Sequence, residues 1–172
     1  LSNVANESVQ LAIAEIAESG FIRAAFETEI DDEDEPEIFD IMIPNNRATI
    51  TALQDVAAYC AIYSTVGTVP KIEKPLISSD MIVIAGDSYG SFIEAIKLDS
   101  ENNSKRIFDL IEVANFMEII PLMNLACAAV ASLMKDKPNE EIATMFGRPP
   151  MTKEDEEKIM KEHASLMEVV DF

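Results

Sequence analysis

The sequence has no tryptophan, one histidine and two cysteines among its 172 residues, and these shortages exclude several kinds of site. A lone histidine and two distant cysteines, Cys60 and Cys127, provide no closely spaced pair of metal ligands. Both cysteines lie in apolar, helix-like surroundings, where a thiol usually behaves as a small hydrophobic side chain. We therefore expect no metal centre and no disulfide framework.

Basic residues are also scarce. Thirteen Lys and Arg residues stand against 32 Asp and Glu residues, which gives a net charge of -19. Such a charge repels nucleic-acid phosphates and anionic lipid headgroups, so neither is an expected partner. No apolar run approaches the roughly 18 residues that a membrane helix needs, and the start of the chain lacks a basic region before an apolar core. The expected location is the cytoplasm, the nucleus or both.

The apolar residues that are present make up 48% of the chain, which is enough to bury a real core. Where they recur at three- and four-residue steps they predict helices, and where they alternate or form short β-branched runs they predict strands. The expected helices are 16–26, 48–63, 105–117, 121–134, 138–146 and 153–167. The expected strands are 1–4 and 8–14, joined as a hairpin, 38–43 and 81–85. The acidic run 31–35 is expected to be a solvated loop.

One segment has the pattern of a hydrolase nucleophile turn. Gly86-Asp87-Ser88-Tyr89-Gly90 fits G-x-S-x-G, and Asp99 or Asp109 with His163 could complete a triad. Too few strands precede Ser88 for a hydrolase sheet, and no stretch suits an oxyanion hole. The segment also lacks the Gly-Lys-Ser/Thr ending of a phosphate loop. We interpret it as a turn that uses glycine for backbone freedom, and we expect no enzyme activity and no cofactor.

The strongest motif lies in the second half of the chain. Residues 107–119 read Ile-Phe-Asp-Leu-Ile-Glu-Val-Ala-Asn-Phe-Met-Glu-Ile. This segment resembles the L-F-x-L-I-x-A-A-N-Y-L-x-I motif of the S-phase kinase-associated adaptor family, whose members link F-box proteins to cullin ubiquitin ligases. Further matches follow in the family's order over 122–137, 140–146 and 152–157, and fainter ones occur in the first half. The resemblance therefore spans nearly the whole chain.

The resemblance implies a mixed α/β (α+β) fold. A BTB/POZ-like domain with short strands packed on helices would cover 1–136, with an acidic loop at 29–37 and a variable insert at 64–104. C-terminal helices over 137–172 would bind the F-box. The implied function is a non-enzymatic adaptor that links an F-box protein to a cullin scaffold in a heteromeric complex. An alternative remains open, in which a divergent adaptor is a structural subunit with an F-box-like protein in a non-ligase assembly.

The resemblance also implies site residues. Asn115 and Phe116 stand where the family has its cullin-facing Asn-Tyr pair, although Phe116 could equally be core on an apolar helix. The sequence departs from the family at 88–92, at 146–152, which is one residue shorter, and in lacking the terminal tryptophan. The last two departures fall where the F-box would dock, so the partner preference is expected to have shifted. The implied F-box-binding residues are Leu133, Ile142, Phe146, Met151 and Ile159.

Overall fold

The computed structural model describes residues 1–11, 16, 18–29, 41–97, 103–148 and 152–163. The chain divides into two units, Leu1–Lys135 and Asp136–Phe172, which we call the first and the second unit. The expected acidic loop at 31–35 lies outside the described residues. Among the residues that are described, no helix combines the length and the apolar character that crossing a bilayer requires.

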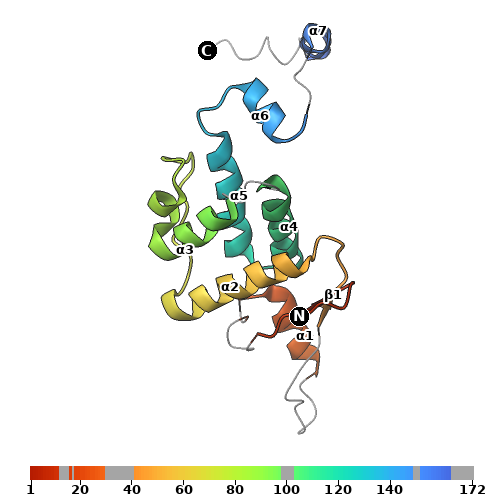
Figure 1. Cartoon of the computed structure of the whole chain (residues 1–172), viewed down its shortest axis with the longest axis vertical. Coiled ribbons are helices and arrows are strands. Elements are labelled where there is room, and N and C mark those ends of the chain that lie inside the picture. The colour runs from red at the N-terminus through yellow and green to blue at the C-terminus, as the bar shows by residue number, and fades with distance from the viewer. Residues whose placement is uncertain (12–15, 17, 30–40, 98–102, 149–151, 164–172) are drawn as a thin grey trace. The chain divides into compact units, whose positions relative to one another are not determined.

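The first unit is mainly helical (Figure 1). Helix α4 packs against both α2 and α5, and α3 contacts all three of these helices. The long helices expected around 48–63, 105–117 and 121–134 are confirmed. Pro121 lies in the first turn of α5, where a backbone N–H would have no helical partner and its absence costs nothing. The helices are α1 (Gly20–Glu29), α2 (Ile50–Val66), α3 (Met81–Lys97), α4 (Asn103–Phe116) and α5 (Ile120–Met134).

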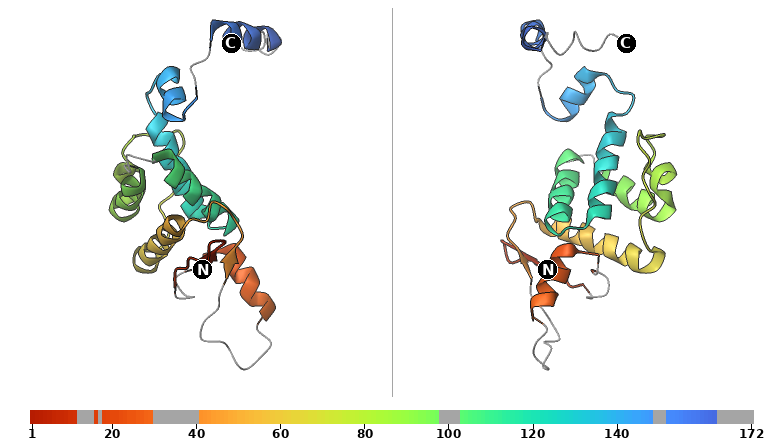
Figure 2. Two further views of the ribbon diagram at one scale, coloured as in Figure 1. Left: turned by 45° about the vertical axis from the view of Figure 1, so that its right-hand side comes forward. Right: turned by 180° about the vertical axis from the view of Figure 1, so that it is seen from behind.

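The core of the first unit is built from the apolar faces of these helices. Leu53 on α2, Leu110 and Val113 on α4, and Leu122 and Leu125 on α5 are all fully buried. Burying one such side chain stabilises a fold by about 1.5–3 kcal/mol, so the shared face of α2, α4 and α5 holds the unit together. Figure 2 shows α4 and α5 side by side from two further directions.

The opening hairpin is present over the described residues 1–9. Leu1 and Val9 exchange two backbone hydrogen bonds of 2.8 Å each, and Asn3 donates its N–H to the Glu7 carbonyl at 3.0 Å. The Asn3 side-chain oxygen accepts the N–H groups of Ala5 and Glu7, which closes the turn. The strand β1 (Ser2–Asn3) also pairs in parallel with β2 (Met42–Ile43). Residues 12–15 and 38–40 of the expected strands lie outside the described part.

The strand expected over 81–85 is wrong, because these residues are helical. The β-branched run Ile82-Val83-Ile84 suggested a strand, yet Ile82 and Val83 are exposed on the first turns of α3. Side chains satisfy the first backbone donors of this helix. The Asp80 carboxylate accepts the Ile82 N–H at 2.8 Å, and the Glu94 carboxylate accepts the Met81 N–H at 2.9 Å. These capping bonds favour the helix over the β preference of the run.

Helix α3 is broken at Gly86, whose φ of 78° and ψ of 172° are not helical. The turn predicted from the glycines is therefore present, but it joins two helical segments and does not follow a strand. The second segment returns against the first. A Cβ atom added at Gly90 would lie 2.4 Å from the Cα atom of Ile82, so only glycine fits this approach.

The described part of the second unit contains two short helices, α6 (Asn139–Met145) and α7 (Lys153–Glu162). Neither has a buried residue. Helix α7 begins with the expected cap, since the Thr152 hydroxyl accepts the Asp155 N–H at 3.2 Å and donates to its carboxylate at 2.7 Å. The part of this helix that was expected over 164–167 lies outside the described residues. Among the described residues, neither helix is therefore stabilised by a buried side chain of its own.

Candidate partner-binding surfaces

The first candidate surface is the C-terminal end of α4, where Asn115 and Phe116 lie. Asn115 is exposed, and Phe116 is half-buried. The Phe116 ring lies 5.0 Å from the ring of Phe21 on α1, at an interplanar angle of 50°. Such a tilted pair contributes about 0.5–1.5 kcal/mol beyond the area it buries. The aromatic pair fixes the ring of Phe116 while leaving part of it accessible.

A buried serine secures α1 to this end of α4. The hydroxyl of Ser19 donates to the carbonyl of Met117 at 2.5 Å and accepts the N–H of Ile22 at 3.1 Å. Ser19 therefore satisfies a carbonyl beyond the last turn of α4 and a free N–H in the first turn of α1. The contacts of Ser19 and Phe21 with this end of α4 could not be predicted from the sequence, because their partners lie almost a hundred residues away and leave no local pattern.

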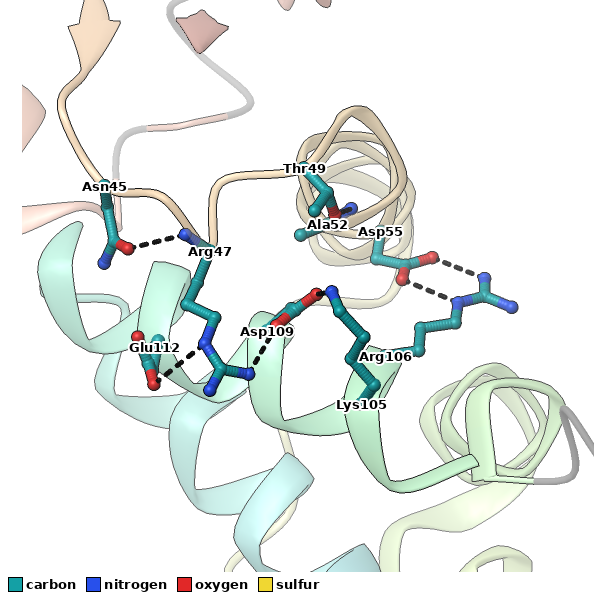
Figure 3. A network of polar contacts seen from close by, with 9 residues as sticks. All are labelled: Asn45, Arg47, Thr49, Ala52, Asp55, Lys105, Arg106, Asp109 and Glu112. Carbon is teal, nitrogen blue, oxygen red and sulfur yellow. Dashed lines mark hydrogen bonds and ion pairs between the residues drawn. The ribbon is translucent and has the colours of Figure 1, made fainter. Parts of the chain in front are cut away.

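Two arginines fix α4 against the start of α2 (Figure 3). Arg106 makes two parallel bonds, of 3.0 and 2.7 Å, to the carboxylate of Asp55, whose side chain is only 7% exposed. Arg47, in the loop before α2, reaches the Asp109 carboxylate at 3.0 Å and the Glu112 carboxylate at 3.6 Å. Bidentate and charge-assisted bonds of this kind are the strong ones in proteins. They determine where the exposed end of α4 points.

Asp109 is the centre of the second ion-pair group. Its side chain is 3% exposed, and it also accepts a bond from Lys105 at 2.5 Å. The hydrogen bond to Asp109, followed by the charge of Glu112, raises the pKa of the Arg47 guanidinium above its usual value. The Arg47 guanidinium therefore stays charged over the physiological range, and its contacts with Asp109 and Glu112 hold α4 in place.

Tyr59 on α2 and Tyr89 on α3 form an aromatic cluster between these two helices. The Tyr59 hydroxyl donates to the Glu18 carboxylate at 2.7 Å, and the Tyr89 hydroxyl donates to the carbonyl of Gly67. The rings of Tyr59 and Tyr89 lie 5.7 Å apart. The pKa of Tyr59 is raised, mainly by burial. Burial is also the main cause that raises the pKa of Tyr89 to about 12. Both phenols are therefore neutral packing groups with satisfied hydroxyls.

The structure does not supply the strand, turn and helix that a hydrolase nucleophile needs. Ser88 is exposed on α3, after a helical segment instead of a strand. The Asp109 carboxylate forms ion pairs with Arg47 and Lys105. Asp99 lies outside the described residues. His163 caps the end of α7 and is exposed. Within the described ranges, no three His, Cys, Asp or Glu side chains gather as a metal site.

The implied F-box-binding residues are divided between the two units. Leu133 is half-buried on α5 in the first unit. Ile142 and Phe146 are half-buried at α6, and Ile159 on α7 is 46% exposed. Met151 lies outside the described residues. Ile142, Phe146 and Ile159, within the described part of the second unit, are therefore only partly covered by their own helices.

Comparison with known proteins identifies the class to which this chain belongs. Residues 121–166, which include α6, α7 and all but the first residue of α5, match the Skp1 family, dimerisation domain. The chain is 34% identical over 125 residues to an S-phase kinase-associated protein 1 homolog of Tetrahymena thermophila, covering 72% of this chain and 70% of the relative. The chain belongs to the Skp1 family.

Other relatives match shorter stretches. A Skp1-related protein of Caenorhabditis elegans is 38% identical over 80 residues, which cover 45% of this chain and 43% of that protein. The SCF ubiquitin ligase complex protein SKP1a of Dictyostelium discoideum is 40% identical over 58 residues, which cover 33% of this chain and 36% of that protein. The family membership predicted from the motif at 107–119 is thereby confirmed.

Proposed function

We propose that this chain is a non-enzymatic adaptor that joins an F-box protein to a cullin scaffold in a ubiquitin ligase. The observation that carries the proposal is its similarity to family members whose names place them in SCF ubiquitin ligase complexes. The partly covered apolar residues of α6 and α7 agree with a surface that a partner completes. The names of these relatives give no support to the alternative of a structural subunit in a non-ligase assembly.

The F-box side of the proposed adaptor is the second unit. Its described helices bury no residue of their own, and short helices of this length are marginally stable alone in water. A helical partner that covers Ile142, Phe146 and Ile159 would add the apolar packing that these helices lack. Aromatic anchors near the centre of an interface dominate its binding energy, so Phe146 is the side chain expected to contribute most.

Replacing Phe146 with alanine tests this surface. Truncating such an anchor typically costs about 2 kcal/mol or more, so the affinity for a purified F-box domain should fall about thirtyfold or more. Isothermal titration calorimetry of the full chain measures the change. Val83→Ala removes an exposed apolar side chain from the first unit and should leave the affinity unchanged. If Phe146→Ala binds as tightly as the wild type, the second unit is not the docking surface.

The cullin side is proposed to be the end of α4. Asn115 is exposed there, Phe116 keeps part of its ring accessible beside Phe21, and the ion pairs of Arg47 and Arg106 hold the helix in place. A surface held in one position before binding avoids the ordering cost that weakens association. Rigid support of an exposed polar and aromatic pair is what such a docking site requires.

Asn115→Lys tests the cullin side without touching the core. It adds bulk and a charge where the cullin is proposed to lie, so binding of a purified cullin N-terminal domain should weaken at least tenfold. Gln54→Lys makes the same change at an exposed position of α2 and is the matched control. Binding of the F-box domain should persist in both variants. Unchanged cullin binding by Asn115→Lys would disprove the assignment of this surface.

A further inference from the structure

A groove of about 690 Å³ lies in the first unit, between the linker at 69–76 and helix α5. On the linker side Ile72 and Leu76 line it, and on α5 it is lined by Ile120, Asn124, Cys127 and Ala131. These α5 residues recur at steps of four, three and four, so they occupy one face of the helix. That face extends over roughly 16 Å, at 1.5 Å per residue. None of these residues belongs to the proposed F-box or cullin surface.

The groove is apolar along its length and accessible from solvent. Ile120, in the first turn of α5, is 49% exposed. Leu122 and Leu125, on the same helix, are fully buried in that core. Helix α5 therefore has two apolar faces, one packed inside the unit and one left in the groove.

The charged residues that line the groove have the opposite sign to the chain as a whole. They are Lys71 and Lys74, in a chain whose net charge is -19. Lys71 forms an ion pair of 3.0 Å with Glu73, but both side chains are highly exposed, so this pair is weak, and Glu73 does not line the groove. An approaching carboxylate would therefore be attracted at this groove and repelled over most of the remaining surface.

We propose that this groove is a second docking site, which binds a segment of a partner protein that carries apolar side chains together with carboxylates. The apolar side chains pack on Ile72, Leu76 and Ile120, the carboxylates pair with Lys71 and Lys74, and the Asn124 amide accepts or donates one hydrogen bond. This is recognition of a peptide along a helix-lined groove, with the charges fixing orientation and register. A basic segment would meet two lysines at the same place.

A peptide selection on the full-length chain tests the proposal. A displayed library of random peptides about 12 residues long, which spans the groove as a helix, is selected on the wild type. Peptides that also bind Ala131→Trp, in which an indole fills the groove, are removed by counter-selection. The expected result is enrichment of peptides that combine aliphatic residues with Asp and Glu. No enrichment, or enrichment of basic peptides, would overturn the proposal.

An enriched peptide, synthesised with a fluorescent label, then locates the site by fluorescence anisotropy. Lys71→Glu combined with Lys74→Glu keeps the shape of the groove, changes only exposed side chains, and should weaken binding at least tenfold. Arg23→Glu reverses an exposed charge on α1, which does not line the groove, and should have no effect. In parallel, saturating peptide should slow alkylation of Cys127, the exposed cysteine of the groove, whereas Cys60 is buried. Binding that is equal in the charge-reversed variant and the wild type would place the peptide elsewhere and reject the site.

Discussion

Replacing Gly90 with alanine tests the packing of α3 most directly, because two general effects predict opposite results. In an ordinary exposed helix, changing glycine to alanine stabilises the fold by up to about 1 kcal/mol. At Gly90, however, the new Cβ atom would lie 2.4 Å from the Ile82 Cα and 2.6 Å from the Met81 carbonyl oxygen. Both contacts are far shorter than real Cβ contacts, and both partners are backbone atoms that cannot rotate away.

The magnitude follows from these two terms. Overpacking of this kind costs about 1–3 kcal/mol, and the upper end applies here because the first segment of α3 must shift as a body. After the gain in helix propensity is subtracted, we expect a net loss of about 2 kcal/mol in the free energy of unfolding. For a domain of this size such a loss lowers Tm by roughly 4–8 °C.

Circular dichroism melting of the full chain measures this change. Ser91→Ala is the matched control, because Ser91 is exposed on the same helical segment and its replacement should alter stability by less than about 0.5 kcal/mol. A Gly90→Ala protein that melts at or above the wild-type temperature would refute the return of the second segment of α3 against the first. The same result would reopen the question of why G-x-S-x-G occurs here.

Three further predictions concern the ion pairs, the tyrosines and a helix cap. Arg106→Ala leaves the carboxylate of Asp55 buried without its bidentate partner, so it should lower the free energy of unfolding by about 2–3 kcal/mol, as measured by urea titration. Adding Asp55→Ala to this variant should recover part of the loss. The folded state raises the pKa of Tyr89 to about 12, so the contribution of this neutral phenol to stability is complete below pH 10 and is lost as the pH rises toward 12. The free energy of unfolding, measured between pH 10 and pH 12, should therefore fall less steeply in Tyr89→Phe than in the wild type. The Thr49 hydroxyl accepts the N–H of residue 52 at the start of α2, so Thr49→Ala should cost about 1 kcal/mol by thermal melting, whereas Thr51→Ala, at an exposed position of the same helix, should cost less.

The helices that could be predicted from sequence are those whose apolar spacing and tertiary packing agree. Helices α2, α4 and α5 are long, and their buried residues recur at three- and four-residue steps, so periodicity alone located them. The segment at 81–85 was mistaken for a strand because Ile, Val and Ile favour β structure when only local preference is considered. Its helix depends on Glu94, thirteen residues further along the chain, which no short window includes.

The candidate surfaces show the same limit. The motif at 107–119 led to the Skp1 family, and that membership is confirmed. The roles of Asn115, Phe116 and the C-terminal apolar residues remain predictions. The contacts that support α4 could not be read from the sequence, because Arg47 and Asp109 are 62 residues apart and Arg106 and Asp55 are 51 apart. Ion pairs at such separations have no periodic signature, and only the folded chain brings their members together.

The turn between α4 and α5, at 117–119, is a place where an inserted or deleted residue would disrupt the fold. Glu118 has a φ of 55°, and the Ile119 N–H donates a hydrogen bond to the Ala114 carbonyl at 2.9 Å. This turn geometry fixes which face of α5 points into the core. One inserted or deleted residue there would rotate α5 by about 100°. Leu122 and Leu125 would then leave the core, and the groove face would turn away from the linker. Relatives of this chain should therefore tolerate insertions more readily in the linker at 69–76 than in the turn at 117–119, which should keep its length.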